Sequence, residues 1–538
     1  MKKCRMALVP IVCAWLSIGT PAMAQHEHLA AGSENVGNVE FQVSCDPKVQ
    51  PDFNRAVALL HSFWYQNAAD LFATIAKTDP SCGMAHWGVA MTHYHQLWEP
   101  PTDGDLMAGL AAVEKAKSAG AKTERERGYI AAVEAFYKDF ASVPHRTRAL
   151  AFERALEQLS ARNPQDHEAA IFYALAVRAN ALPGDKTLTN QKKASAILEN
   201  ILAEEPEHPG LAHYIIHCDD YPGLAQQGLD AARRYAKIAP ASPHALHMPS
   251  HIFTRLGLWQ ESIESNLASE AAARKEHGAG DELHARDYLV YAYLQRGEDS
   301  KAKKVFEALP QLRTGDPAYF AGLYSIGTMV ARYALERRSW AEAAALTVPP
   351  RVFPGGRYAW TEANIHFARV LGAARKGDAG AARRALQQLT ALHDTLVNGQ
   401  DMYWAEQVDI QREIGSAWIA FSERNKDDAL RRMRAAADHE DVTDKHPVTP
   451  GVVLPARELL GEMLLELNQP MLALEAFETS LRSAPERLHA LYGAARAAQL
   501  AGNLRKARTY YSKLLTNCIM ADGDRLEIRE AKTFLARK

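Results

Sequence analysis

The amino-acid sequence predicts an all-α solenoid built from stacked helical hairpins. From Asp52 onward, segments of about 12–16 residues carry apolar residues at helical spacing, and Pro, Gly or Asp-Pro ends each segment. Signals typical of strands are almost absent, and the segment pattern repeats along the chain. Hairpins of this kind cannot bury their apolar faces alone, so we expect neighbours to stack into one core with a concave groove.

The N-terminus predicts export. The stretch MKKCRMALVPIVCAWLSIGTPAMAQ has a basic start, a short apolar run and small residues before a cleavage site after Ala24. We predict a signal peptide at 1–24, a disordered polar leader at 25–48, and a periplasmic or secreted mature protein. No later segment reaches about 18 uninterrupted apolar residues, so we expect no transmembrane segment. The net charge of -2 gives no electrostatic case for binding nucleic acid.

Four cysteines follow the predicted cleavage site: Cys45, Cys82, Cys218 and Cys518. In an oxidising compartment Cys45 and Cys82 are the natural disulfide pair, although four cysteines allow three pairings. This bond would tie the segment before the first helix to the turn after the first helical pair. We interpret Cys218 as a small buried residue rather than a metal thiolate.

The C-terminal region gives the clearest repeat. Small, aromatic and proline residues recur there with a period of 34 residues, and the N-terminal region carries the same trace. The positions are Gly461, Leu464, Ala473, Phe477 and Pro485, then Ala495, Gly502, Ala507 and Tyr511, and near the N-terminus Ala68, Phe72 and Pro80. The small residues would let the two helices of a hairpin approach closely. In these positions the chain resembles the tetratricopeptide repeat (TPR) superfamily, which implies a TPR-type superhelix.

The chain also resembles a family of exported bacterial TPR proteins. The shared stretches are HSFWYQNAADLF, MAHWGVAM, HALHMPSHIF, KHPVTPG and LYGAARAA. This resemblance implies a fold and no particular chemistry. We predict an N-terminal array at 49–345, an irregular helical region with long loops at 346–453 and C-terminal repeats at 454–538. The Pro- and Gly-rich loops near 345–360 and 437–453 are either functional or capping insertions, or breaks between sub-arrays.

Histidines recur in repeat register in the middle of the chain. The offset from His213 to His247 is 34 residues, as is the offset from His217 to His251. Taking Gly223, Gly257 and Gly297 as equivalent helix ends places successive repeats at Pro209, Pro243 and Leu283. The second residues of the three repeats are Gly210, His244 and His284, the fifth His213, His247 and Asp287, and the ninth His217, His251 and Tyr291.

These positions share one helix face, and neighbouring helices pack about 8–10 Å apart, so the side chains can converge. The TPR resemblance implies that they line the groove. Imidazole and carboxylate ligands suit a transition metal such as Zn, Cu or Fe. The candidate ligands are His213, His217, His247, His251 and Asp287, with His244, His284, Tyr288, Tyr291, His86 and His93 as supporting or ligand-binding residues. Two other interpretations stay open: a polar groove for a peptide, protein or small molecule, and histidines that bond carbonyls between repeats.

Pro249 complicates the register, because a proline inside a helix removes a hydrogen bond and clashes with the preceding turn. Either the helix kinks there, or it begins there and leaves His244 and His247 on an ordered loop.

A second group of candidate residues lies in MAHWGVAMTHYHQLWEPP and consists of His86, His93, His95, Trp98 and Glu99. His446 in KHPVTPG would belong to a loop that folds back over the groove.

The functional expectation is an exported TPR-type binding protein with a histidine-rich, transition-metal-binding site in its central groove. One alternative is a metal-dependent hydrolytic or oxidative enzyme that uses the same site, and another is a metal-free protein–protein scaffold. The chain lacks a P-loop, a dinucleotide fingerprint, a GxSxG elbow and an HExxH motif. Tyr214 stands where a zinc protease would carry its glutamate, which argues against that class.

Overall fold

The computed structural model describes residues 34–97, 100–182, 184–307, 309–313, 319–348 and 358–537. The predicted signal peptide, the first part of the predicted leader, Trp98, Glu99 and part of the loop at 345–360 lie outside these residues. The chain divides into a unit of residues Met1–Glu34 and a unit of residues Asn35–Lys538.

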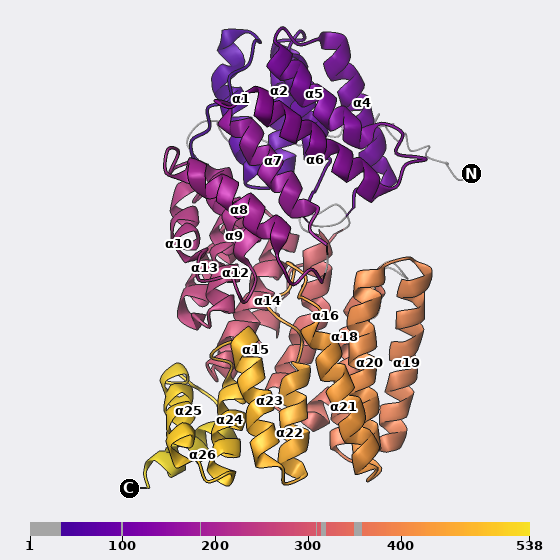
Figure 1. Cartoon of the computed structure of the whole chain (residues 1–538), viewed down its shortest axis with the longest axis vertical. Coiled ribbons are helices and arrows are strands. Elements are labelled where there is room, and N and C mark those ends of the chain that lie inside the picture. Colours follow the sequence, from indigo (N-terminus) through magenta and orange to yellow (C-terminus); the bar gives the residue numbers. More distant parts are fainter. Residues whose placement is uncertain are drawn as a thin grey trace, which may run out of the picture. The chain divides into compact units, whose positions relative to one another are not determined.

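The second unit is an all-α solenoid of helical hairpins. Each helix packs against the next, and the first helix of most hairpins also packs against the first helix of the following hairpin (Figure 1). Across the described ranges no residue is in a strand, and no helix is long and apolar enough to cross a membrane. The fold class predicted from the sequence, a TPR-type helical-hairpin solenoid, is confirmed.

The N-terminal hairpins begin after a short 3-10 helix, η1. Their elements are η1 (Pro47–Val49), α1 (Gln50–His61), α2 (Tyr65–Thr78), α3 (Gly83–Thr92), α4 (Asp103–Ala119), α5 (Glu124–Tyr137), α6 (His145–Arg162), α7 (His167–Ala179), α8 (Thr189–Leu202), α9 (Pro209–Asp219), α10 (Leu229–Ile238), α11 (Pro243–His247), α12 (Pro249–Arg255) and α13 (Trp259–Lys275).

The remaining hairpins continue the same plan to the C-terminus. Their helices are α14 (Ala279–Gln295), α15 (Asp299–Glu307), α16 (Tyr319–Glu336), α17 (Trp340–Ala345), α18 (Ala359–Arg375), α19 (Ala379–Asn398), α20 (Met402–Ser422), α21 (Lys426–Asp441), α22 (Ala456–Glu466), α23 (Pro470–Ser483), α24 (Leu488–Leu500), α25 (Leu504–Asn517) and α26 (Leu526–Leu535).

The repeat glycines act as the sequence predicts. A Cβ atom on Gly461 would lie 2.7 Å from the Phe477 ring, and one on Gly493 would lie 2.3 Å from the same ring. Both distances are shorter than van der Waals contact allows, so α22 and α24 can pack on Phe477 of α23 only with glycine at these positions. Gly257 and Gly297, with φ of +70° and +68°, follow α12 and α14 in the left-handed conformation that lets a helix end tightly.

The predicted disordered leader is wrong for its described part, residues 35–48. Val36, Val39 and Phe41 are buried in the N-terminal core. The Phe41 ring packs 4.9 Å from the Tyr129 ring, and Arg125 lies over its face. The few apolar residues of this polar segment are therefore enough to anchor it, since each buries a large apolar surface.

The Cys45–Cys82 disulfide predicted from the sequence is present, with a sequence separation of 37 residues. It joins the leader to the residue that precedes α3. Cys218 and Cys518 are free and buried, as the interpretation of Cys218 as a small core residue requires.

Replacing both Cys45 and Cys82 by Ser should lower the free energy of unfolding of the N-terminal hairpins by about 3–4 kcal/mol. The reason is that the unfolded chain regains the entropy of the closed loop. Guanidinium denaturation followed by tryptophan fluorescence measures this change. An unchanged midpoint in both the variant and the reduced wild-type protein would contradict the expectation.

Candidate metal centre

Four helical segments bring six histidines together. α9 contributes His213 and His217, one turn apart, α11 contributes His244 and His247, α12 contributes His251, and α14 contributes His284. Met248, between α11 and α12, keeps helical angles of φ -53° and ψ -36°. α12 thus begins at Pro249, with the proline in its first turn, directly after α11, so the helix is interrupted there while His244 and His247 remain on helix.

The six side chains form two groups of three. In the first triad, the Nε2 atom of His213 lies 3.1 Å from Nε2 of His217 and 3.1 Å from Nε2 of His244. The second triad consists of His247, His251 and His284, and its His247 and His251 Nε2 atoms are also 3.1 Å apart. One ring nitrogen from each member of a triad lies within 4.8 Å of the others.

The residues that form the triads thus differ in part from the ligands predicted from the sequence. His244 and His284, expected as supporting residues, are full members of the triads. Asp287 is not a member: it is buried and its carboxylate faces Arg332 at 3.7 Å. Burial raises the pKa of Asp287 to about 6 in spite of that guanidinium. Asp287 shares a repeat position with His213 and His247, but its carboxylate pairs with Arg332 of α16, the first helix of the next hairpin.

The predicted residues Tyr288, Tyr291, His86 and His93 also lie outside the triads. The Tyr291 hydroxyl accepts a hydrogen bond from Arg487 Nη1 at 2.8 Å, and neither residue contributes to a triad. His86 is half-buried on α3, and burial together with nearby Lys115 lowers its pKa. His93 ends the same helix, 3.3 Å from Asp105. The repeat register predicts which residues share a helix face. It does not predict which residues of neighbouring helices that face contacts.

Hydrogen bonds fix the orientation of three of the six imidazoles. Nδ1 of His213 donates to the carbonyl oxygen of His61 at 2.6 Å. Nδ1 of His247 donates to Asn266 Oδ1 at 2.6 Å, and the Asn266 amide group itself donates to Ser262, which identifies Oδ1 as the acceptor. Nδ1 of His251 donates to the carboxylate of Asp220 at 2.9 Å.

With their protons on Nδ1, the neutral forms of these histidines present an Nε2 lone pair to the centre of their triads. Metal-ligating histidines are held in the same way, with the second ring nitrogen donating to a carboxylate or carbonyl. Asn266, Asp220 and the carbonyl of His61 therefore orient candidate ligands, and the sequence pattern did not predict them. Only Asp220 gave a signal, since it lies three residues after His217 in HCDDYPG.

Burial keeps these imidazoles neutral. All six residues are between 0 and 7 % exposed. Burial lowers the pKa of His213 to about 3 and lowers the pKa values of His217, His244, His247 and His284 well below the ordinary range. The pKa of His251 is also lowered, because burial outweighs the attraction of Asp220.

Aromatic rings close the first triad. Phe63 lies in the turn between α1 and α2, with its ring centroid 4.4 Å from that of His213 and 5.6 Å from that of His244. Its φ of +54° is uncommon for a residue with a bulky side chain. Tyr235 stacks on the other side of His213 at 5.1 Å. The predicted groove is thus filled at these positions, and the histidines are enclosed.

A long connection from the far end of the chain closes the second triad. We name residues 443–452, between α21 and α22, the strap. Lys445 of the strap forms an ion pair of 2.8 Å with Asp220, which also pairs with Arg255 at 2.7 Å. The Tyr288 hydroxyl lies 3.3 Å from the Thr449 carbonyl oxygen and 3.3 Å from His251 Nε2. This part of the Pro- and Gly-rich loop 437–453 therefore covers the centre.

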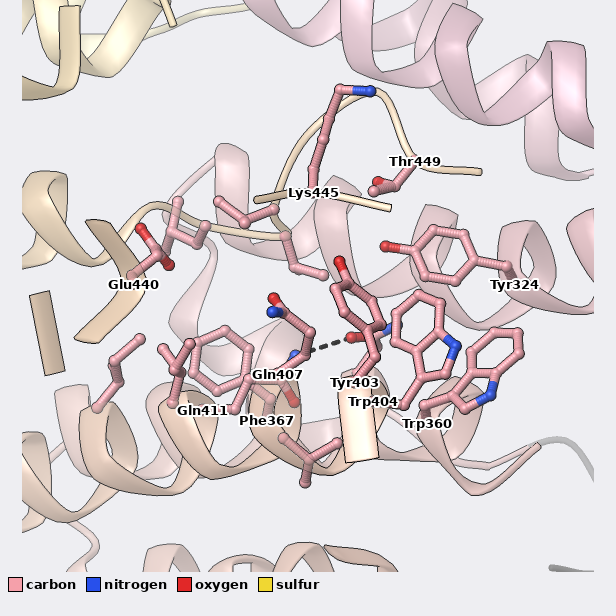
Figure 2. Close-up of a pocket in the computed structure, with 17 residues that line it drawn as sticks. Tyr324, Trp360, Phe367, Tyr403, Trp404, Gln407, Gln411, Glu440, Lys445 and Thr449 are labelled. Carbon is pink, nitrogen blue, oxygen red and sulfur yellow. Dashed lines mark hydrogen bonds between the residues drawn. The ribbon is translucent and has the colours of Figure 1, made fainter. Parts of the chain in front are cut away.

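The other face of the strap borders a cavity of about 40 Å³. Tyr403, Trp404 and Trp360 gather on one side of it, and the Trp360 and Trp404 rings stack with centroids 4.5 Å apart (Figure 2). Lys445 extends away from these rings. His446 packs against Trp404 at 5.3 Å, so it anchors the strap and does not face the triads.

A third group of ionisable side chains is built differently. Glu168 lies 2.9 Å from His61 Nε2 and 2.9 Å from His208 Nε2, and the Tyr214 hydroxyl lies 2.9 Å from His61 Nδ1. Here each close contact joins a donor to an acceptor, since the carboxylate accepts from both imidazoles. Burial alone would raise the pKa of Glu168, but these two histidines outweigh it and lower the pKa. We interpret this group as a hydrogen-bond network that supports His213 through the His61 carbonyl.

The strap should loosen when Lys445 is replaced by Met, because Asp220 then loses one of its buried cationic partners. We expect backbone amides of residues 443–452 to exchange hydrogen at least about tenfold faster, as measured by mass spectrometry. Lys513→Met is the matched control, since it removes an exposed ion pair with Glu486. Equal exchange in the two variants would contradict the role of Lys445.

Comparison with known proteins finds only distant likenesses between structures. No protein-family model matches the chain, and no curated protein matches it in sequence. The human IFIT1 dimer with PPP-AAAA is 12% identical, with 89% of this chain and 96% of that chain covered and a TM-score of 0.39. The Cut9–Hcn1 hetero-tetramer of the APC/C is 10% identical, with 90% and 96% covered and a TM-score of 0.28. Naa15/Naa10 bound to HypK-THB is 12% identical, with 91% and 74% covered and a TM-score of 0.25.

Proposed function

We propose that this chain is an exported helical-repeat protein that binds a transition metal through its two buried histidine triads. The observation that carries the proposal is the contact between Nε2 of His247 and Nε2 of His251 at 3.1 Å. Both residues use their Nδ1 protons elsewhere, so two lone pairs face each other. Such a contact is repulsive unless a cation stands between the nitrogens.

A metal ion fits this spacing. Two imidazole nitrogens bound to one tetrahedral Zn²⁺, each about 2.05 Å from the ion, lie about 3.3 Å apart. A shared proton is the other cation that such a pair can hold. Burial disfavours it, since the pKa values of His247 and His251 are both lowered. A metal ion with three imidazole ligands gains coordination bonds that offset the cost of burial.

The enclosure favours an ion over a larger ligand. The six imidazoles are almost completely buried beneath Phe63, Tyr235 and the strap. A peptide or protein in a concave groove would need exposed side chains to contact, and these histidines offer none. The group at Glu168 supports the distinction, because histidines there pair donors with acceptors and need no ion.

A metal-dependent enzyme would require the same ion. The Tyr288 hydroxyl, 3.3 Å from His251 Nε2, is then the polar group placed to assist catalysis.

Export is proposed from the N-terminal sequence, and the disulfide between Cys45 and Cys82 suits an oxidising compartment.

Elemental analysis of untagged protein from the exported fraction tests the proposal. We expect at least about one equivalent of a transition metal per chain. His217→Ala and His251→Ala should each lower the metal content, because each removes one ligand from a triad. His86→Ala should not change it, since His86 is half-buried on α3 and outside both triads.

Less than about a tenth of an equivalent, with no uptake on titration with Zn²⁺ or Cu²⁺, would contradict the proposal. The metal-free protein–protein scaffold would then be the better interpretation. Equal loss of metal in His86→Ala and His251→Ala would also contradict it, because the metal would then lie elsewhere.

A further inference from the structure

The two triads lie against each other as one cluster of six rings. The His217 and His251 centroids are 6.1 Å apart, and the His244 and His247 centroids are 6.3 Å apart. These distances join different triads, yet neither exceeds the longest distance within a triad, which is 6.2 Å for His217–His244 and 6.3 Å for His251–His284. Two ions bound by the triads would therefore be close neighbours.

The repeat makes the two triads equivalent. Each triad combines the fifth and ninth residues of one repeat with the second residue of the next. His213, His217 and His244 occupy these places in the first triad, and His247, His251 and His284 occupy them in the second. Equivalent positions supply equivalent ligands, so a structure that holds an ion in one triad holds a second in the other.

The charges around the cluster favour ions of low charge. Imidazole ligands are neutral and bring no negative charge to the ion. Asp220, the carboxylate in contact with His251, already pairs with Arg255 and Lys445. Arg178 donates to the carbonyl oxygen of His217 at 2.8 Å and adds a further positive charge. Two buried divalent ions would place four positive charges in this setting, which is unfavourable without compensating anions.

We infer that the two triads form one dinuclear copper(I) centre, with three imidazole ligands to each ion. Copper binds imidazole well and has a stable monovalent state, so a pair of Cu⁺ ions adds half the charge of a divalent pair. Phe63, Tyr235 and the strap exclude water from the centre, which protects the monovalent state. This inference rests on the proposed function and adds the number and class of its ions.

Anaerobic titration of the metal-free full-length mature chain with Cu⁺, against a chromophoric Cu⁺ chelator, tests the inference. We expect two equivalents per chain for the wild-type protein and one for His244→Asn and for His284→Asn. The control His93→Asn should keep two, since His93 pairs with Asp105 outside the cluster. Circular dichroism checks each variant, and a variant that loses its helical signal is replaced by the Gln variant at the same position.

X-ray absorption on the wild-type protein with two Cu⁺ ions provides a measurement that needs no variant. We expect nitrogen ligands and a copper–copper distance below about 5 Å, since ions that share one centre lie about 3.5–4 Å apart. A single equivalent, or two without copper–copper scattering, would overturn the dinuclear centre and leave metal binding intact. Displacement of Cu⁺ by a tenfold excess of Zn²⁺ would overturn the choice of copper. No uptake of any metal would overturn the inference and the proposed function together.

Discussion

The centre of this protein depends on one contact, the approach of two imidazole nitrogens that both carry lone pairs. Asn266 and Asp220 fix the protons of His247 and His251 on Nδ1, and these two residues lie on successive helices, α11 and α12. The Nε2 atoms then meet at 3.1 Å. Two lone pairs at this distance are stable only with a cation between them. The surrounding helices therefore hold the two imidazoles in positions that suit a metal ion.

The solenoid explains how so many histidines can be buried together. Neighbouring first helices of successive hairpins present the same residue positions to a shared space, and a repeat offset of 34 residues places histidines there twice. The strap completes the enclosure from more than 150 residues farther along the chain, through Lys445 and the carbonyl of Thr449. A contact of that sequence separation stabilises the second triad only after most of the array has folded.

The sequence was sufficient for the fold, the Cys45–Cys82 disulfide and the general location of the histidine centre, because these follow from helical periodicity and a fixed repeat. The repeat register also placed Asp287 among the candidate ligands, because register identifies the helix face of a residue but not what that face contacts. In the structure the Asp287 carboxylate pairs with Arg332. The roles of Asn266 and Lys445 depend on contacts between different hairpins. No local pattern predicts which side chain will meet Asp220 from 225 residues away.

Anomalous diffraction from crystals grown with Cu⁺ would locate the ions. We predict a peak within about 2.1 Å of Nε2 of both His247 and His251, and a second peak in equivalent contact with His213 and His217. A map with no peak between these nitrogens, or with the ion bound instead at the Glu168 group, would contradict this prediction.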